Sequence, residues 1–260
     1  MKNLIPLLCL GLLLPAFVPD QAQARPRKKG RSYNVTLRVK YRGKWYTYDH
    51  YTKRGMANSV DRIRSEDGKS RDLIWNTVVS KHGKDRSRLS LQYQLEFGAL
   101  TKRGKSPIQI QAQVIVPKGR EVLLAKGYGW KVLTTVGRAS EENDEEEAPA
   151  KYPGGNYVVQ ARVTHLGKTY YVRKAIEPGT QSNFVGSVRA KKAKERLMII
   201  NSLLSDDQGG ISMQYQTEFS QTTRNVIFQV QGETKLQNGV EKLVKKGRKW
   251  ELKLKATRTD

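Results

Sequence analysis

The chain carries one ordered set of sequence landmarks twice, and this internal repeat constrains its fold more than any other feature. The segments Ser90–Phe97 and Ser212–Phe219 read SLQYQLEF and SMQYQTEF. Further landmarks match in the same order, pairing Arg38–Tyr46 with Arg162–Tyr170, Leu73–Asn76 with Met198–Asn201, Gln109–Gln111 with Gln229–Gln231, and Gly127–Trp130 with Gly247–Trp250. Repetition at this spacing is typical of tandem copies of one folding unit. The sequence therefore predicts two similar domains, at residues 32–138 and 156–260, which we call copy one and copy two.

An acidic segment separates the two copies. Residues 139–155 carry six acidic side chains between Glu141 and Glu147 and show no apolar periodicity. Like charges repel one another, so such a segment extends rather than packs. We expect a flexible linker here.

Alternating apolar and polar residues predict five strands in each copy. In copy one the alternation covers Val35–Tyr41, Trp45–Tyr51, Leu89–Phe97 and Ile108–Val116, and a last strand at Glu121–Val136 is broken near Gly127 or Gly129. Alternation of this kind is typical of a sheet with one buried and one solvated face.

A helix is expected between the second and third strands of each copy. Leu73, Ile74, Trp75, Val78 and Val79 form a broad apolar face at helical spacing. In copy two the corresponding residues are Leu197, Ile200 and Leu204, with Lys191 and Glu195 four residues apart as a helical ion pair. The predicted fold class is therefore α+β: two tandem ββαβββ domains, each an antiparallel sheet with one helix on its apolar face.

The N-terminus predicts export. Lys2, the apolar run Leu4–Val18 and the sequence Ala22-Gln23-Ala24 follow the order of a cleavable signal peptide, which places the mature start at Arg25. The only cysteine, Cys9, lies inside this signal, so the mature chain has no disulfide. No later stretch is apolar enough to span a membrane. We expect a periplasmic or secreted protein of bacterial type, beginning with a basic, disordered arm at residues 25–31.

No motif for catalysis or for a cofactor is present. The three histidines, His50, His82 and His165, have no partner at metal-ligand spacing. Glu96 and Glu218 are the only acidic residues at matching strand positions, one in each copy. Glycoside hydrolysis usually needs two carboxylates at one bond. The sequence therefore predicts a protein that is not an enzyme and holds neither metal nor cofactor.

Several polar and aromatic residues are candidates for a binding site. A glutamine face is shared by both copies and consists of Gln92, Gln94, Gln109, Gln111, Gln214, Gln216, Gln229 and Gln231. Amides donate and accept hydrogen bonds, so this face could bind sugars or peptide backbone. The alternative, which composition favours, is a solvated sheet face or the surface where the two copies meet. Trp45 and Tyr51 have no aromatic counterpart in copy two, which leaves them free to serve a site in copy one. For Trp45 the alternative is a partly buried packing residue.

Positive charge is the strongest functional signal. The chain holds 48 Lys and Arg against 24 Asp and Glu, for a net charge of +24, and both copies share the excess. The arm adds Arg27, Lys28 and Lys29. Such a balance favours anionic partners: an envelope polymer, lipid headgroups or nucleic acid.

Three functions of different kinds follow. The first is an exported, non-enzymatic envelope protein whose two basic modules bind or scaffold an anionic surface or another exported protein. The alternative is an extracellular nucleic-acid-binding protein that uses Trp45 and its aromatic neighbours for stacking. The third is a cell-wall glycan hydrolase acting through Glu96 or Glu218.

Overall fold

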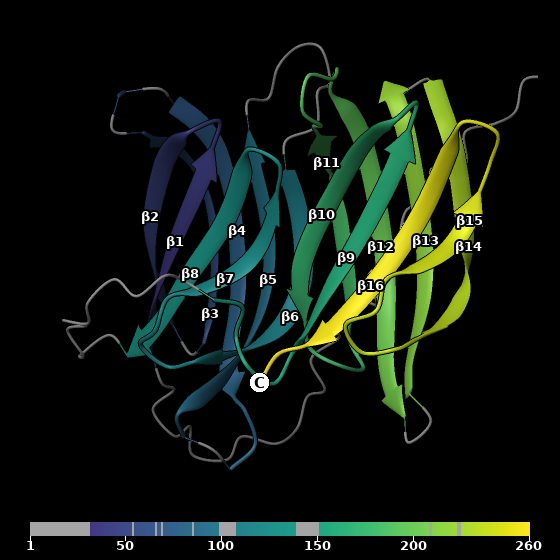
Figure 1. Ribbon diagram of the computed structural model, residues 1–260. Helices are drawn as coiled ribbons and strands as arrows, with labels where there is room; N and C mark the ends of the chain where they lie inside the picture. The colour runs from purple at the N-terminus through teal and green to yellow at the C-terminus, as the bar shows by residue number, and fades with distance from the viewer. Residues whose placement is uncertain are drawn as a thin grey trace, which may run out of the picture.

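The computed structural model describes residues 32–53, 55–65, 67–68, 70–84, 86–98, 108–138, 151–207, 210–222 and 225–260. Over these residues the chain forms sixteen β-strands and no helix, arranged as two eight-stranded antiparallel sheets that pack face to face (Figure 1). The predicted signal peptide, the predicted basic arm and residues 139–150 of the predicted linker lie outside the described residues.

The two sheets are called sheet A and sheet B. In spatial order, sheet A contains β15 (Lys242–Lys246), β16 (Trp250–Arg258), β9 (Tyr157–His165), β10 (Lys168–Ile176), β7 (Val122–Gly127), β8 (Trp130–Arg138), β1 (Tyr33–Tyr41) and β2 (Lys44–Thr52). Sheet B contains β14 (Asn225–Leu236), β13 (Gly210–Thr222), β12 (Arg196–Asp207), β11 (Gln181–Val188), β6 (Ile108–Pro117), β5 (Arg88–Gly98), β4 (Ser70–Lys81) and β3 (Met56–Arg64).

The predicted α+β class is wrong, because both segments expected to be helical are strands. The first is β4, in which Leu73, Trp75 and Val79 face the core at a period of two. The second is β12, in which Met198, Ile200 and Leu204 do the same. Glu195, expected to pair with Lys191 along a helix, instead pairs with Arg189 at 3.0 Å, measured from Nε to Oε1.

A buried polar residue explains why the period of two is hidden in these strands. Thr77 of β4 is 2% exposed and lies 2.8 Å from the Nε2 atom of His50. At the matching position of β12, Ser202 is also 2% exposed and shares a hydrogen bond of 2.9 Å with Ser182. Each polar residue interrupts the apolar inner face, and its partner comes from another strand. The remaining apolar residues then resemble a helical stripe.

Each copy contributes four strands to each sheet. Strands β1, β2, β7 and β8 of copy one lie in sheet A, and the meander β3–β6 lies in sheet B; copy two repeats this pattern with β9–β16. The chain therefore crosses from one sheet to the other twice in each copy. The inner faces of the two sheets pack together and form a shared core.

The two copies join edge to edge in both sheets. Strand β10 pairs with β7 in sheet A, and β11 pairs with β6 in sheet B. Phe184 of copy two is fully buried at this junction and stacks on Trp130 of copy one, with ring centroids 5.7 Å apart and an interplanar angle of 6°. One buried cluster of apolar side chains runs through both copies.

The repeated Gly–Trp landmark forms a tight turn in each copy. A Cβ atom on Gly127 would lie 2.5 Å from the indole nitrogen of Trp130, and one on Gly247 would lie 2.4 Å from that of Trp250. The tryptophan ring folds back over the glycine, which leaves no space for a side chain there. This explains why the same pair stands at the same place in both copies.

Candidate functional site

The outer face of sheet A carries a line of seven side chains, five of them basic, that crosses seven strands. We call it the basic row. From β2 to β16 its members are Trp45, Lys40, Lys131, Lys126, Arg173, Gln160 and Lys255, each the cross-strand partner of the next. Neighbouring strands lie about 4.8 Å apart, so the row is roughly 29 Å long. It runs over the junction between the copies, where Lys126 meets Arg173.

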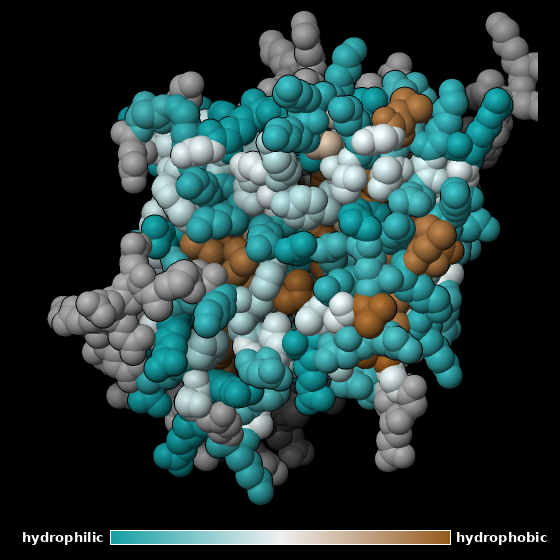
Figure 2. Space-filling model, viewed as in Figure 1, coloured by the Kyte–Doolittle hydropathy of each residue, from teal (hydrophilic) through white to brown (hydrophobic). Residues whose placement is uncertain are grey.

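Strand alternation sets the direction of these side chains. On β1, for example, Leu37 and Val39 are fully buried while Arg38 and Lys40 face outward. The same period of two orients the cations of β7, β8, β10 and β16 outward. Figure 2 shows this face covered mostly by hydrophilic side chains, with smaller hydrophobic patches between them.

One aromatic ring and one amide contact cations of the row, and the same ring also contacts Arg38 beside the row. The guanidinium of Arg38 and the ammonium of Lys131 each lie 4.7 Å from the Trp45 ring centroid, and the ammonium of Lys40 lies 5.5 Å from it. Arg173 donates a hydrogen bond from Nε to the side-chain oxygen of Gln160. Cation–π contacts of this kind stabilise a charge without neutralising it.

The five cations of the row keep their charge available. Within the described part of the chain, none of Lys40, Lys126, Lys131, Arg173 and Lys255 forms an ion pair with a carboxylate. Like charges directly opposite each other destabilise a sheet. The pKa of Lys126 is accordingly lowered, first by burial and then by repulsion from Arg173 and Lys131. The row is a site of unbalanced positive potential.

The second candidate surface is the outer face of sheet B, where all eight predicted glutamines lie. Four of them join four asparagines in a line across every strand of the sheet, which we call the amide row. Its members, from β3 to β14, are Asn58, Asn76, Gln94, Gln111, Asn183, Asn201, Gln216 and Gln231. Each copy contributes the same order, Asn-Asn-Gln-Gln. The other glutamines, Gln92, Gln109, Gln214 and Gln229, lie in the flanking rows.

Sequence reasoning missed the four asparagines. Asn76 and Asn201 belong to a matched landmark, but the segments that contain them were predicted to be helical. The prediction therefore did not place these two asparagines in the sheet. Asn58 lies on β3, an edge strand with little apolar alternation, and Asn183 lies on its counterpart β11. The match of Asn76 with Asn201 could have found two of them, because an aliphatic residue stands two positions to either side in both copies.

The aromatic and basic candidate residues do not lie together in one site. Trp45 belongs to the basic row. Tyr51, 53% exposed, faces the same side of β2 but lies six residues further along the strand, roughly 20 Å away. Arg27, Lys28 and Lys29 lie outside the described residues.

The histidines are structural or distant from one another. His50 is buried, with Nδ1 2.7 Å from the Ser59 hydroxyl, and burial lowers its pKa. His165 is buried against the ring of Phe219, and its pKa is lowered by burial and by nearby cations. His82 lies 3.9 Å from Glu177, measured from Nδ1 to Oε1. In the described ranges, no three potential ligands gather as a metal site requires.

The two glutamates proposed for hydrolysis are far apart. Glu96 and Glu218 belong to one cross-strand row, with Gln109, Val185 and Ile199 between them. Four strand spacings amount to roughly 19 Å. The two carboxylates of a glycosidase flank one bond at about 5–9.5 Å, so these two cannot act on the same bond.

Comparison with protein-family models, curated proteins and solved structures finds no match for this chain. The argument for function therefore rests on the geometry of the two rows. Among the described residues, no helix is long and apolar enough to cross a membrane.

Proposed function

We propose that this protein is an exported, non-enzymatic binding protein of the cell envelope that holds a linear anionic polymer along the basic row of sheet A. The observation that carries the proposal is a line of five cations across the junction between the copies, interrupted at one strand by Gln160. Among the described residues, none of the five forms an ion pair with a carboxylate. A linear polyanion placed along the row meets one positive charge at nearly every strand.

The energy of such binding comes mainly from released counterions. If all five cations engage, the logarithm of affinity falls with the logarithm of salt concentration at a slope of about −4. Threefold more salt then weakens binding roughly 80-fold. Because the row crosses both copies, neither copy alone retains the full set of contacts.

Trp45 favours one particular alternative. Its ring closes one end of the row, with three cations within 5.5 Å of the ring centroid. An aromatic ring beside concentrated positive charge is the combination with which proteins bind single-stranded nucleic acid. An exported nucleic-acid-binding protein is therefore the second candidate. Preference for DNA over heparin, abolished by Trp45→Ala, would favour it.

The test removes two central charges of the row. Lys126→Gln/Arg173→Gln should lower heparin affinity and make the salt slope less negative by about 1.5 to 2. The matched control, Lys84→Gln/Lys168→Gln, removes the same charge from two exposed positions outside the row, a turn residue and the first residue of β10. If the control weakens binding as much as the row variant, attraction is spread over the whole surface and the row is not the site.

A further inference from the structure

We propose that the amide row of sheet B is a second binding site, for an uncharged polyhydroxyl chain, which is the chemistry of a neutral glycan. The protein would then hold a polyanion on one face and a neutral polysaccharide on the other.

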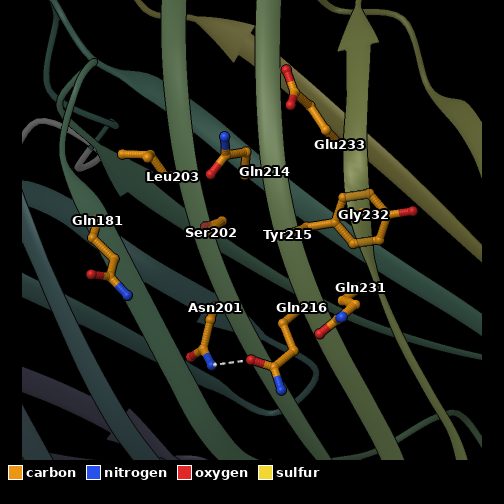
Figure 3. Close-up of a pocket in the computed structure, with 10 residues that line it drawn as sticks. All are labelled: Gln181, Asn201, Ser202, Leu203, Gln214, Tyr215, Gln216, Gln231, Gly232 and Glu233. Atoms are coloured by element: carbon orange, nitrogen blue, oxygen red, sulfur yellow. Dashed lines mark hydrogen bonds between the residues drawn. The ribbon is translucent and has the colours of Figure 1, made fainter. Parts of the chain in front are cut away.

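The row offers hydrogen-bonding groups that its own members do not use. Asn201 donates a hydrogen bond of 3.3 Å to Gln216 (Figure 3). Asn76 donates one of 3.4 Å to Gln94, and both bonds are long. Among the residues that the structure describes, the side-chain oxygens of Asn183 and Asn201 are shielded from water and have no hydrogen-bond partner. Buried polar atoms without a partner are rare in native proteins. Because these two oxygens are closed to solvent, a ligand hydroxyl meets the exposed amides beside them, those of Gln94 and Gln216.

The surface is hollowed along the row. An open groove of about 560 Å³ lies over copy two, lined among others by Asn201, Gln214, Gln216 and Gln231 (Figure 3). A smaller hollow of about 80 Å³ lies over Gln94, Gln111 and Asn183, where the copies meet. The two hollows follow the row across the strands, as an extended ligand requires.

Aliphatic side chains flank the amides at matching positions of both copies. Ile74 and Val78 lie on either side of Asn76 on β4, and Ile199 and Leu203 lie on either side of Asn201 on β12. Val78 and Leu203 are 37% and 38% exposed. Sugars present hydroxyls at their edges and C–H groups on their faces, and sites that bind such ligands combine a few placed polar groups with apolar walls.

Charge excludes the polyanion from this face. The amide row contains no charged residue, and the rows beside it hold Glu96, Glu218 and Glu233 but no lysine or arginine. If two molecules of this protein met through this face, these carboxylates would lie close together and repel one another. A second protein molecule is therefore disfavoured as the ligand of this face. An uncharged ligand is the one that the face fits.

The experiment measures binding of cellohexaose, maltohexaose and chitohexaose by calorimetry at 50 and 500 mM salt. We expect at least one to bind with little salt dependence. Asn201→Ala/Gln216→Ala should weaken that binding roughly 10- to 30-fold, the effect of losing about two net hydrogen bonds. The control Gln221→Ala/Gln237→Ala removes two exposed amides outside the row and should leave affinity unchanged.

Several outcomes would overturn this inference. Absence of binding to every hexasaccharide at millimolar concentration would do so, as would equal effects of the row variant and its control. If the wild type instead self-associates in sedimentation and the row variant loses this association, that result would assign the face to a contact between two molecules of this protein. Heparin binding is measured in parallel: the amide variants should leave it intact, so failure here and failure of the polyanion proposal are distinguishable.

Discussion

Lys174 gives the sharpest test of the energetics of this fold. Its side chain is 1% exposed between the sheets, and its ammonium makes one hydrogen bond, of 3.4 Å, to the carbonyl of Ile200. Burial lowers its pKa from 10.5 to about 7. In the repeat it takes the place of His50, whose ring is held by two hydroxyl groups. A lysine buried here lowers the free energy of unfolding at every pH at which the lysine of the unfolded chain is protonated.

The sign of the pH effect follows from proton binding. Between pH 7 and 10.5 the unfolded chain keeps the Lys174 proton while the folded chain loses it, so stability rises with pH. Below pH 7 both forms are protonated and the full penalty remains. The two pKa values correspond to a penalty of about 4 kcal/mol at pH 7 and about 1 kcal/mol at pH 10.

Replacing Lys174 by methionine should therefore stabilise the protein. Methionine fills a similar volume without a charge, and it gives up one hydrogen bond, a loss of about 1 kcal/mol. The expected gain is about 3 kcal/mol at pH 7, or roughly 6–12 °C in Tm, and close to zero at pH 10. Urea unfolding of the wild type and of Lys174→Met at pH 7 and pH 10 measures this gain. The difference in unfolding free energy between the two proteins cancels the contributions of the other titrating groups.

Two results would refute this reasoning. One is a Lys174→Met protein less stable than wild type at pH 7. The other is a stability difference that stays the same at pH 10, since the ammonium would then not be the group that opposes folding. Lys168→Met, an exposed change on the same strand, is the control and should shift stability by less than about 0.5 kcal/mol.

Two further predictions concern packing. Phe184→Ala removes the ring that stacks on Trp130 at the junction and should destabilise the protein by about 3–5 kcal/mol in urea unfolding, with exposed Val226→Ala as a neutral control. A separate, earlier unfolding transition of copy two would accompany it if the junction couples the copies. Gly127→Ala should displace the Trp130 ring, lowering stability by about 1–3 kcal/mol and changing near-UV circular dichroism. An unchanged spectrum would show that the ring does not pack on this glycine.

The local sequence was sufficient to predict those strands in which apolar or aromatic residues occupy the core-facing positions. The alternation in Leu89–Phe97 predicts β5, and the same pattern predicts β1, β2 and β6 to within one or two residues. It failed at β4 and β12, because Thr77 and Ser202 are buried beside polar partners on other strands. It also missed β3, an edge strand in which little apolar surface is buried.

The sequence by itself determined the repeat, the strand-forming alternation and the excess of positive charge, since each is a property of residues close together in the chain or of their sum. Only the tertiary structure decided which side chains share a row. Lys126 and Arg173 are 47 positions apart in the sequence numbering and become neighbours because β7 pairs with β10. Asn183 meets Gln111 for the same reason, through β11 and β6. Register between distant strands is set by packing of the shared core, and a shift of one residue would turn both rows inward.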